Sequence, residues 1–449
     1  MVARLPERRT RAAETSSLPL LMTEGSASAA RAPAVVAILV TTDPGPWFEE
    51  TLQALAAQDY SNLSVLVLVA GGSSDPTEVV ARGLPEAFVR RLPESEGFAA
   101  AVDEALWMVE GASFFLLLHD DCAPSPDAVH LMVEESFRSN AGIVCPKMVH
   151  WDEPRALLHV GQSIDKTGAV IERVQAGEID AGQHDAVRDV FVAPGGCTLV
   201  RGDLFRALGG YDAAIVAMGE DLDLSWRAHV AGARVVVAPS ATARHLGLVA
   251  AGRRPPPPSD APSLQALQRR HELAAVLTCY SWGHLVRVVP QALLLSLGEA
   301  VVARLAGDRR RARAVVHAWR WNLARWRELR SRRAALAAVR VVSDAEVRSL
   351  QVRGSARLST YVSRLTHQGL EVAHGLRPSR PPDALPPELP QPRGSGAGAE
   401  LTDSIGLGFD DDAGFDALDD LGRRGRRTRE TGPAGVSAAG RARPRGPGA

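Results

Sequence analysis

Two acidic clusters in this sequence have side chains suited to holding a metal-bound phosphate and to moving a proton. The first is Asp120-Asp121, which directly follows His119 and the apolar run Phe114–Leu118. Adjacent carboxylates at the end of a buried strand repel each other unless hydrogen-bond donors or a cation neutralise them, and a hard divalent ion bound to phosphate oxygens does this well. The pair therefore favours a metal site, although the same residue types are also typical of a helix cap or a surface turn.

The second cluster, Glu220, Asp221 and Asp223, lies about a hundred residues further along the chain. These residues begin a predicted helix, where acidic side chains also suit the helix dipole. The dipole does not account for the Gly-Gly turn at 195–196 before one strand, or for His245 just after another. A carboxylate near a metal-bound phosphate can accept a proton from an incoming hydroxyl, so the second cluster is a candidate general base.

The elements that must position these residues alternate between apolar runs of strand length and stretches of helix length. The expected strands are Val35–Thr41, Val65–Ala70, Phe114–Leu118, Cys197–Val200 and Arg234–Ala238. The expected helices are Trp47–Ala57, Phe98–Val109, Asp203–Leu208 and Glu220–Ala231. This rhythm predicts an α/β fold in which a mainly parallel sheet is covered by helices on both faces. Ligands of such sheets bind at the carboxyl ends of the strands, where both acidic clusters are expected.

Composition and charge limit the class of protein but do not identify a binding partner. The chain has 449 residues, of which 45% are apolar, and a formal charge of -1, so it can bury a sizeable α/β core. The four cysteines are far apart and show no spacing typical of zinc or redox sites, which favours reduced thiols in the core. Arginines concentrate between Arg304 and Arg340, but no nucleic-acid-binding module surrounds them, so we expect no nucleic acid partner.

Shifts in composition divide the chain into five parts. The expected parts are a disordered leader at 1–33, an α/β catalytic domain at 34–252, a proline-rich linker at 253–263, a helical region at 264–375 and a disordered tail at 376–449. In the helical region, the apolar stretch 284–306 is interrupted by charged residues, so we expect no transmembrane span. Arginine and tryptophan follow it, a mixture that favours anionic lipid headgroups. Either 284–340 lies on a membrane surface, or it is a helical pair with a solvated basic face.

The order of apolar strand, Asp-Asp, glycine turn, Glu-Asp-x-Asp-Leu-x-x-Arg and later histidine resembles the family 2 glycosyltransferases with a GT-A fold, over residues 34 to 250. The sequence especially resembles the bacterial rhamnosyl- and galactofuranosyl-type members of this family. The resemblance implies that Asp121 binds the metal, with His119 at the first position of the family's Asp-x-Asp motif and His245 as a further ligand. It also implies that Asp221 is the catalytic base and that Glu220 supports it or binds the acceptor.

The resemblance further implies a set of substrate-binding positions. They are Thr41, Asp43, Asp75, Asp120, Gly195, Gly196, Asp223 and Arg227. The chain departs from the family at Ala70, where relatives commonly have an aspartate that contacts the nucleotide base, and at His119, which replaces an aspartate. Asp43 is a candidate for the contact missing at Ala70. We predict that Asp43→Ala weakens nucleotide binding.

The implied function is that of an inverting, metal-dependent glycosyltransferase. Its donor would be a dTDP- or UDP-linked sugar, its cofactor Mn²⁺ or Mg²⁺, and its acceptor a cell-envelope polysaccharide or glycolipid. The expected location is the cytoplasmic face of the cell membrane, as a peripheral protein. Two alternatives stay open: a catalytically weakened member that binds nucleotide sugars or acts as a membrane scaffold, and a sugar-nucleotide nucleotidyltransferase. The latter expects a basic phosphate loop after the first strand, which the segment 41–45 does not offer.

Overall fold

The computed structural model describes residues 32–92, 97–256, 259–261, 263–352 and 354. The predicted leader, except for residues 32 and 33, and the whole predicted tail lie outside these ranges, as does the end of the predicted helical region. Within them, every cysteine is buried and unpaired, as the sequence predicts.

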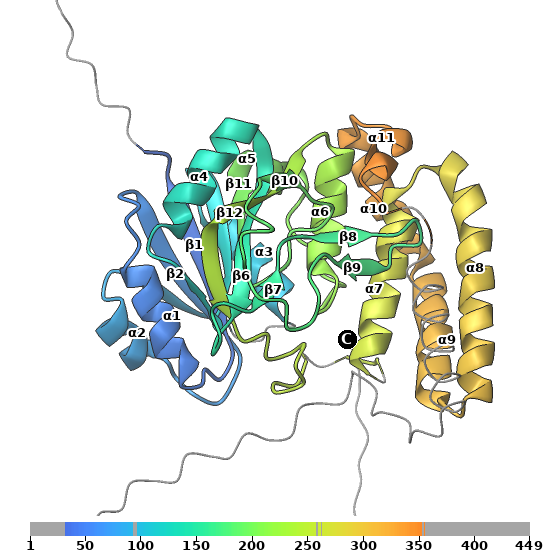
Figure 1. Ribbon diagram of the computed structural model, residues 1–449, viewed down its shortest axis with the longest axis horizontal. Coiled ribbons are helices and arrows are strands. Elements are labelled where there is room, and N and C mark those ends of the chain that lie inside the picture. Colours follow the sequence, from blue (N-terminus) through green and yellow to red (C-terminus); the bar gives the residue numbers. More distant parts are fainter. Residues whose placement is uncertain (1–31, 93–96, 257–258, 262, 353, 355–449) are drawn as a thin grey trace, which may run out of the picture. The chain divides into compact units, whose positions relative to one another are not determined.

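A ten-stranded mixed sheet forms the centre of the described chain (Figure 1). Its main path runs in the order β10-β12-β6-β11-β4-β1-β2-β3. These strands are β1 Val35–Thr41, β2 Leu63–Ala70, β3 Phe88–Leu92, β4 Phe114–His119, β6 Ala141–His150, β10 Arg188–Asp189, β11 Cys197–Arg201 and β12 Arg234–His245. Strands β3, β2, β1 and β4 are parallel, as are β6 and β12, while β11 runs antiparallel between β4 and β6.

Three shorter pairings complete the strands. β5 (Cys122–Pro124) pairs with β12, and β7 (Leu157–His159) pairs with β6. β8 (Gln162–Ile164) and β9 (Val170–Glu172) form a separate two-stranded sheet. The pairing of β5 with β12 brings Cys122 opposite His245, so the turn after β4 lies beside the end of β12.

Helices cover both faces of the large sheet because its central strands are apolar on both sides. Alternate residues of β1 face α1 (Trp47–Ala56), α2 (Thr77–Gly83) and α4 (Ala128–Ser139) through Ala37 and Leu39. The intervening residues Ile38 and Val40 share a core with α3 (Phe98–Met108), α5 (Gly202–Ala207) and α6 (Glu220–Val230). The α/β sheet with helices on both faces is therefore confirmed.

Five further helices follow the sheet: α7 Leu264–Cys279, α8 Trp282–Leu305, α9 Arg309–Ala324, α10 Trp326–Val339 and α11 Asp344–Ser349. Besides the two cores on the faces of the sheet, these helices and α6 share a separate hydrophobic core. In it Trp226 contacts Tyr280, with ring centroids 4.9 Å apart. Helix α7 contacts both α6 and α9, and α8 contacts α9 (Figure 1). The helical region thus packs directly on the helix that begins with Glu220 and Asp221.

Helix α8 differs from the sequence expectation. It is one continuous helix of 24 residues through Pro290, and among the described residues it is long and apolar enough to cross a membrane by length and composition. Arg287, Glu299 and Arg304 lie within this helix and do not interrupt it.

Candidate active site

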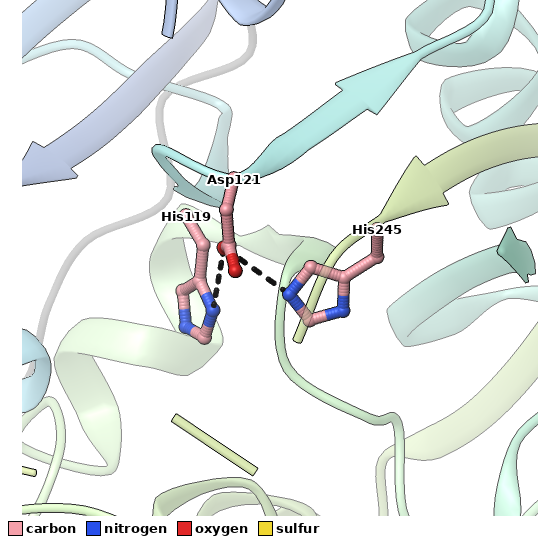
Figure 2. A group of neighbouring side chains, drawn as sticks. All are labelled: His119, Asp121 and His245. Carbon is pink, nitrogen blue, oxygen red and sulfur yellow. Dashed lines mark ion pairs between the residues drawn. The ribbon is translucent and has the colours of Figure 1, made fainter. Parts of the chain in front are cut away.

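Three candidate metal ligands meet at the carboxyl edge of the sheet (Figure 2). His119 is the last residue of β4, Asp121 follows in the turn, and His245 ends β12. Nδ1 of His119 and Nε2 of His245 lie 3.9 Å and 3.3 Å from Oδ1 of Asp121. One possible ligand atom from each residue lies within 4.8 Å of the others. All three residues that the sequence nominated as metal ligands therefore come together.

The protonation of His119 and Asp121 suits a cation. Burial lowers the pKa of His119 to about 4, so its imidazole is neutral at pH 7. Burial alone would raise the pKa of Asp121, but the neighbouring His245 and His119 and the N–H of Leu248, which donates to Oδ2 at 2.9 Å, hold it well below its usual range. Neutral imidazole and ionised carboxylate are the forms in which these groups bind metals.

The chemistry of the donor set also fits a divalent metal. Nδ1 of His245 is buried and lacks a hydrogen-bond partner among the residues that the structure describes, and the polar neighbour of Nε2 is Oδ1 of Asp121, at 3.3 Å. A buried polar atom without a partner costs free energy, and a coordinated cation is one way to satisfy it. Two imidazoles and one carboxylate are borderline ligands that accept Mn²⁺ and other first-row divalent ions.

Asp120, next to the cluster, is engaged inside the protein. Its Oδ2 accepts a hydrogen bond of 2.7 Å from the hydroxyl of Thr41, and both carboxylate oxygens accept from Arg254, at 2.7 Å and 3.0 Å. Burial raises the pKa of Asp120, and the hydrogen bonds and charge of Arg254 oppose that rise. Asp120 and Thr41, both nominated as substrate-binding residues, are thus buried and hydrogen-bonded to each other, and Asp120 is also ion-paired with Arg254.

Glu220 and Asp221 begin helix α6 after a turn with an unusual backbone. Met218 has a φ of 60°, and Gly219 has a φ of 151°. The backbone N–H of Gly219 donates to the Glu220 carboxylate at 2.9 Å. Burial raises the pKa of both acids, and the negative charge of Glu220 raises that of Asp221 further. A buried carboxylate with a raised pKa is suited to proton transfer near neutral pH.

The glycine pair at 195–196 connects the two predicted centres. The N–H of Gly195 donates to Oδ2 of Asp221 at 2.8 Å, and a Cβ on Gly195 would lie 2.9 Å from Oδ1 of the same residue. Gly196 has a φ of 110°, and a Cβ there would lie 2.9 Å from Cε1 of His245. One dipeptide without side chains therefore donates a hydrogen bond to the candidate base and also lies close to a candidate metal ligand.

The loops after β1 and β2 are tied together by Asp43. Its Oδ1 accepts from the backbone N–H groups of Ser73 and Ser74, at 2.7 Å and 2.9 Å, and from both hydroxyls. These hydrogen bonds lower the pKa of Asp43. Asp75 is exposed, and its Oδ1 accepts from the N–H and the hydroxyl of Thr77 at the start of α2. Both nominated carboxylates thus shape the loops at this edge.

Asp223 and Arg227 lie on the buried side of α6. They form an ion pair of 2.7 Å with each other, and Arg227 also donates to the carbonyl of Leu208 at 3.1 Å. Their contacts join α6 to the segment after α5. The pair nominated for substrate binding is therefore placed to hold the helix that carries Asp221. Asp223 and Arg227 contact each other, and Arg227 contacts the carbonyl of Leu208.

Two residues that the sequence analysis did not nominate contact the site. Arg254 comes from the segment predicted to be a linker, and besides its pair with Asp120 it lies 5.5 Å from the ring centroid of Trp47. His271 of α7 lies with Nδ1 3.3 Å from the carbonyl oxygen of Met218, in the turn before Glu220. Arg254 was missed because its segment is rich in proline and was predicted to be a linker. His271 was missed because no local pattern indicates a contact with a residue so distant in the sequence.

Comparison with known proteins assigns the region that contains these site residues to a protein family. The model of the family described as "Glycosyltransferase like family 2" matches residues 33–272, which include every site residue named above. A search of curated proteins finds no match.

Three solved structures are similar to this chain at low sequence identity. GalNAc-T7 with UDP, GalNAc and Mn²⁺ has 12% identity and a TM-score of 0.43, over 55% of this chain and 48% of that one. TarS of S. aureus has 14% identity and a TM-score of 0.40, over 63% and 54%. The mannosyltransferase PcManGT of Pyrobaculum calidifontis, with GDP-Man and Mn²⁺, has 15% identity and a TM-score of 0.38, over 68% and 86%.

The matched region of this chain corresponds to about half the length of the first two of these structures. The family match covers more than half of the chain and coincides with the mixed, mainly parallel sheet and its helices. The chain therefore belongs to the family 2-like glycosyltransferases and has their GT-A arrangement of sheet and helices.

Proposed function

We propose that this protein transfers a sugar from a nucleotide-diphosphate sugar to a hydroxyl group of an acceptor, with inversion at the anomeric carbon. The observation that supports it most directly is the dipeptide Gly195-Gly196, in which Gly195 donates to Asp221 and Gly196 lies close to His245. A candidate base and a candidate metal site that share one short backbone segment can act on the two ends of one reaction.

In the proposed reaction, Asp221 accepts the proton of the acceptor hydroxyl as its oxygen forms a bond to the anomeric carbon. The bond from that carbon to the diphosphate oxygen breaks, and the nucleoside diphosphate leaves with the electron pair. His119, Asp121 and His245 would hold a divalent cation, which supplies neutralisation of the negative charge on the leaving diphosphate. Single displacement with a base opposite the leaving group inverts the configuration.

The remaining residues act on the geometry of this site. Asp43 joins the loops after β1 and β2, where we place the nucleoside, through Ser73 and Ser74. Glu220 is placed beside Asp221 to contact the acceptor or to raise the pKa of the base. Mn²⁺ or Mg²⁺ and a dTDP- or UDP-linked donor are the proposed ligands, and a cell-envelope polysaccharide or glycolipid is the proposed acceptor.

A panel of nucleotide sugars tests the proposal. We expect one donor to raise the melting temperature only with Mn²⁺ or Mg²⁺, because a ligand that binds the folded state alone stabilises it. With that donor, Asp221→Asn should reduce transfer or donor hydrolysis at least about a hundredfold, as expected for a lost general base. Asp203→Asn, at the start of α5 and exposed, is the matched control and should leave the rate unchanged.

Two results would contradict the proposal in different ways. Donor binding without turnover in the parent protein would favour the catalytically weakened, nucleotide-sugar-binding alternative. Equal activity in the parent and in Asp221→Asn would remove Asp221 as the base, whatever the family.

A further inference from the structure

Helix α8 has two contrasting long faces. The inner face packs on the neighbouring helices through Leu285, Val288, Ala292, Ser296, Glu299 and Ala303, at helical spacing. The opposite face exposes large apolar side chains at a similar spacing. They are Val286, Leu293, Leu294, Leu297, Val301 and Leu305, with exposed fractions of 42% to 82%. We call these six residues the outer row of α8. An exposed apolar row of this length is typical of a surface that contacts a partner or a membrane.

Positive charge accompanies the outer row. Arg287 and Arg304 are exposed near its two ends, and Arg309, Arg310 and Arg313 are exposed at the start of α9, immediately after it. Apolar side chains flanked by arginine form the pattern of helices that lie in the boundary between headgroups and acyl chains. The outer row therefore fits an anionic partner that also has an apolar interior.

The positions of the arginines disfavour a second copy of this chain as the partner. Consider an antiparallel two-fold contact centred midway between Leu294 and Leu297. Arg287 and Arg304 lie equally far from that centre on opposite sides, so Arg287 of one copy would face Arg304 of the other. A parallel contact would bring each arginine near its own equivalent. Like charges brought together in this way oppose association, whereas anionic lipid headgroups satisfy them.

The inner face shows how α8 would meet the lipid. The carboxylate of Glu299 is buried and pairs with Arg269 of α7 and with Arg311 of α9, the latter at 2.9 Å. If α8 crossed a bilayer alone, it would lose both partners and expose Glu299 to hydrocarbon. A helix that lies flat in the interface keeps these ion pairs and still buries its outer row.

We propose that the outer row of α8 and the arginines beside it bind an anionic membrane surface, with α8 parallel to the bilayer plane. This inference does not depend on the proposed reaction, because none of its residues belongs to the candidate active site. The sequence predicts a membrane contact at 284–340, and the proposal assigns that contact to the outer row of α8 and the adjacent arginines.

Flotation of the full chain with lipid vesicles tests the proposal. Vesicles of phosphatidylcholine with about a third phosphatidylglycerol should bind the protein, and vesicles of phosphatidylcholine alone should bind it much more weakly. The double substitution Leu294→Glu with Leu297→Glu should reduce binding to anionic vesicles at least tenfold. Trp107→Glu replaces another apolar side chain on a helix, 80% exposed on α3, and should leave binding unchanged.

A second variant separates the charge from the apolar row. Replacing Arg309, Arg310 and Arg313 by glutamine should weaken binding to anionic vesicles at least fivefold and should also reduce its dependence on salt. Circular dichroism melting should show that all variants keep the fold of the parent.

Three outcomes would overturn the proposal. The first is unchanged vesicle binding by the Leu294→Glu, Leu297→Glu variant. The second is a dimer of the parent, seen by analytical ultracentrifugation, that this variant abolishes, which would assign the outer row to a second copy. The third is protein that stays in the membrane after alkaline carbonate extraction, which would assign α8 as a span.

Discussion

Arg254 and Asp120 form a two-point ion pair at the carboxyl edge of the sheet, although 134 residues separate them in the sequence. The Asp120 carboxylate is only 1% exposed and also accepts from Thr41. The segment that carries Arg254 is rich in proline, yet it returns to the site and neutralises one of the two adjacent acids. The other acid, Asp121, then faces the two histidines.

We predict that Arg254→Met destabilises the protein, because it leaves a buried carboxylate without its partner. Loss of one member of a buried pair costs on the order of 3 kcal/mol in the free energy of unfolding. Urea unfolding of Arg254→Met, Asp120→Asn and the double variant should give a coupling free energy of about 1–3 kcal/mol. Arg253→Met, at the exposed neighbour, is the control. Additive effects of the two substitutions would show that the pair contributes no coupling.

Gly196→Ala should weaken metal binding. The new Cβ would lie 2.9 Å from the imidazole of His245, and the φ of 110° is unfavourable for alanine. We expect the affinity for Mn²⁺, measured by titration calorimetry, to fall at least about tenfold, as for other changes that displace a ligand.

A matched control for this substitution is Gly111→Ala. Gly111 also has a positive φ, of 75°, but no atom within 4 Å of an added Cβ. It therefore introduces backbone strain without touching the cluster. Equal loss of Mn²⁺ affinity in both variants would mean that strain, and not contact with His245, explains the effect.

Asp43→Ala should weaken binding of the nucleotide donor. The carboxylate holds Ser73 and Ser74 against the loop after β1, so its removal frees two loops that must be ordered to bind a ligand. Titration calorimetry with the donor identified in the panel should show a lower affinity for Asp43→Ala than for the parent. The control Asp203→Ala should bind the donor with the affinity of the parent. Unchanged affinity would remove Asp43 from the nucleotide site.

The fold was largely predictable because its signals are local. The strand Val35–Thr41 and the starts of the helices at Trp47, Phe98 and Glu220 lie where the apolar periodicity predicts them. The expected end of the last strand at Ala238 is wrong. β12 continues to His245, and the register of its pairing with β6 shifts between Ala238 and Thr242. A bulge of this kind depends on the neighbouring strand, which a single segment does not reveal.

The candidate site was predictable only where residues carry the motif themselves. Asp121, His245 and Asp221 were nominated from their order along the chain, and the structure brings all three to one edge of the sheet. Arg254 and His271 were missed because their roles depend on tertiary packing. The periodicity of a sequence predicts which face of an element is buried, but not which distant side chain neutralises a charge there.

Glu220→Gln should move the pH dependence of the reaction. Burial raises the pKa of Asp221, and the negative charge of Glu220 raises it further, while the N–H of Gly195 lowers it. A general base works in its ionised form, so kcat/KM should rise as the pH rises through the pKa of Asp221. Removal of the Glu220 charge lowers that pKa, and the rising limb should move to lower pH.

The measurement is a profile of kcat/KM against pH for the parent, Glu220→Gln and Glu50→Gln, an exchange of the same kind on α1. The Glu50→Gln profile should coincide with that of the parent. If Glu220→Gln only lowers the rate at every pH, Glu220 acts by contact with the acceptor, and its charge does not set the pKa of Asp221. A limb that moves to lower pH instead shows that the negative charge of Glu220 raises the pKa of Asp221, so that the two carboxylates titrate as a pair.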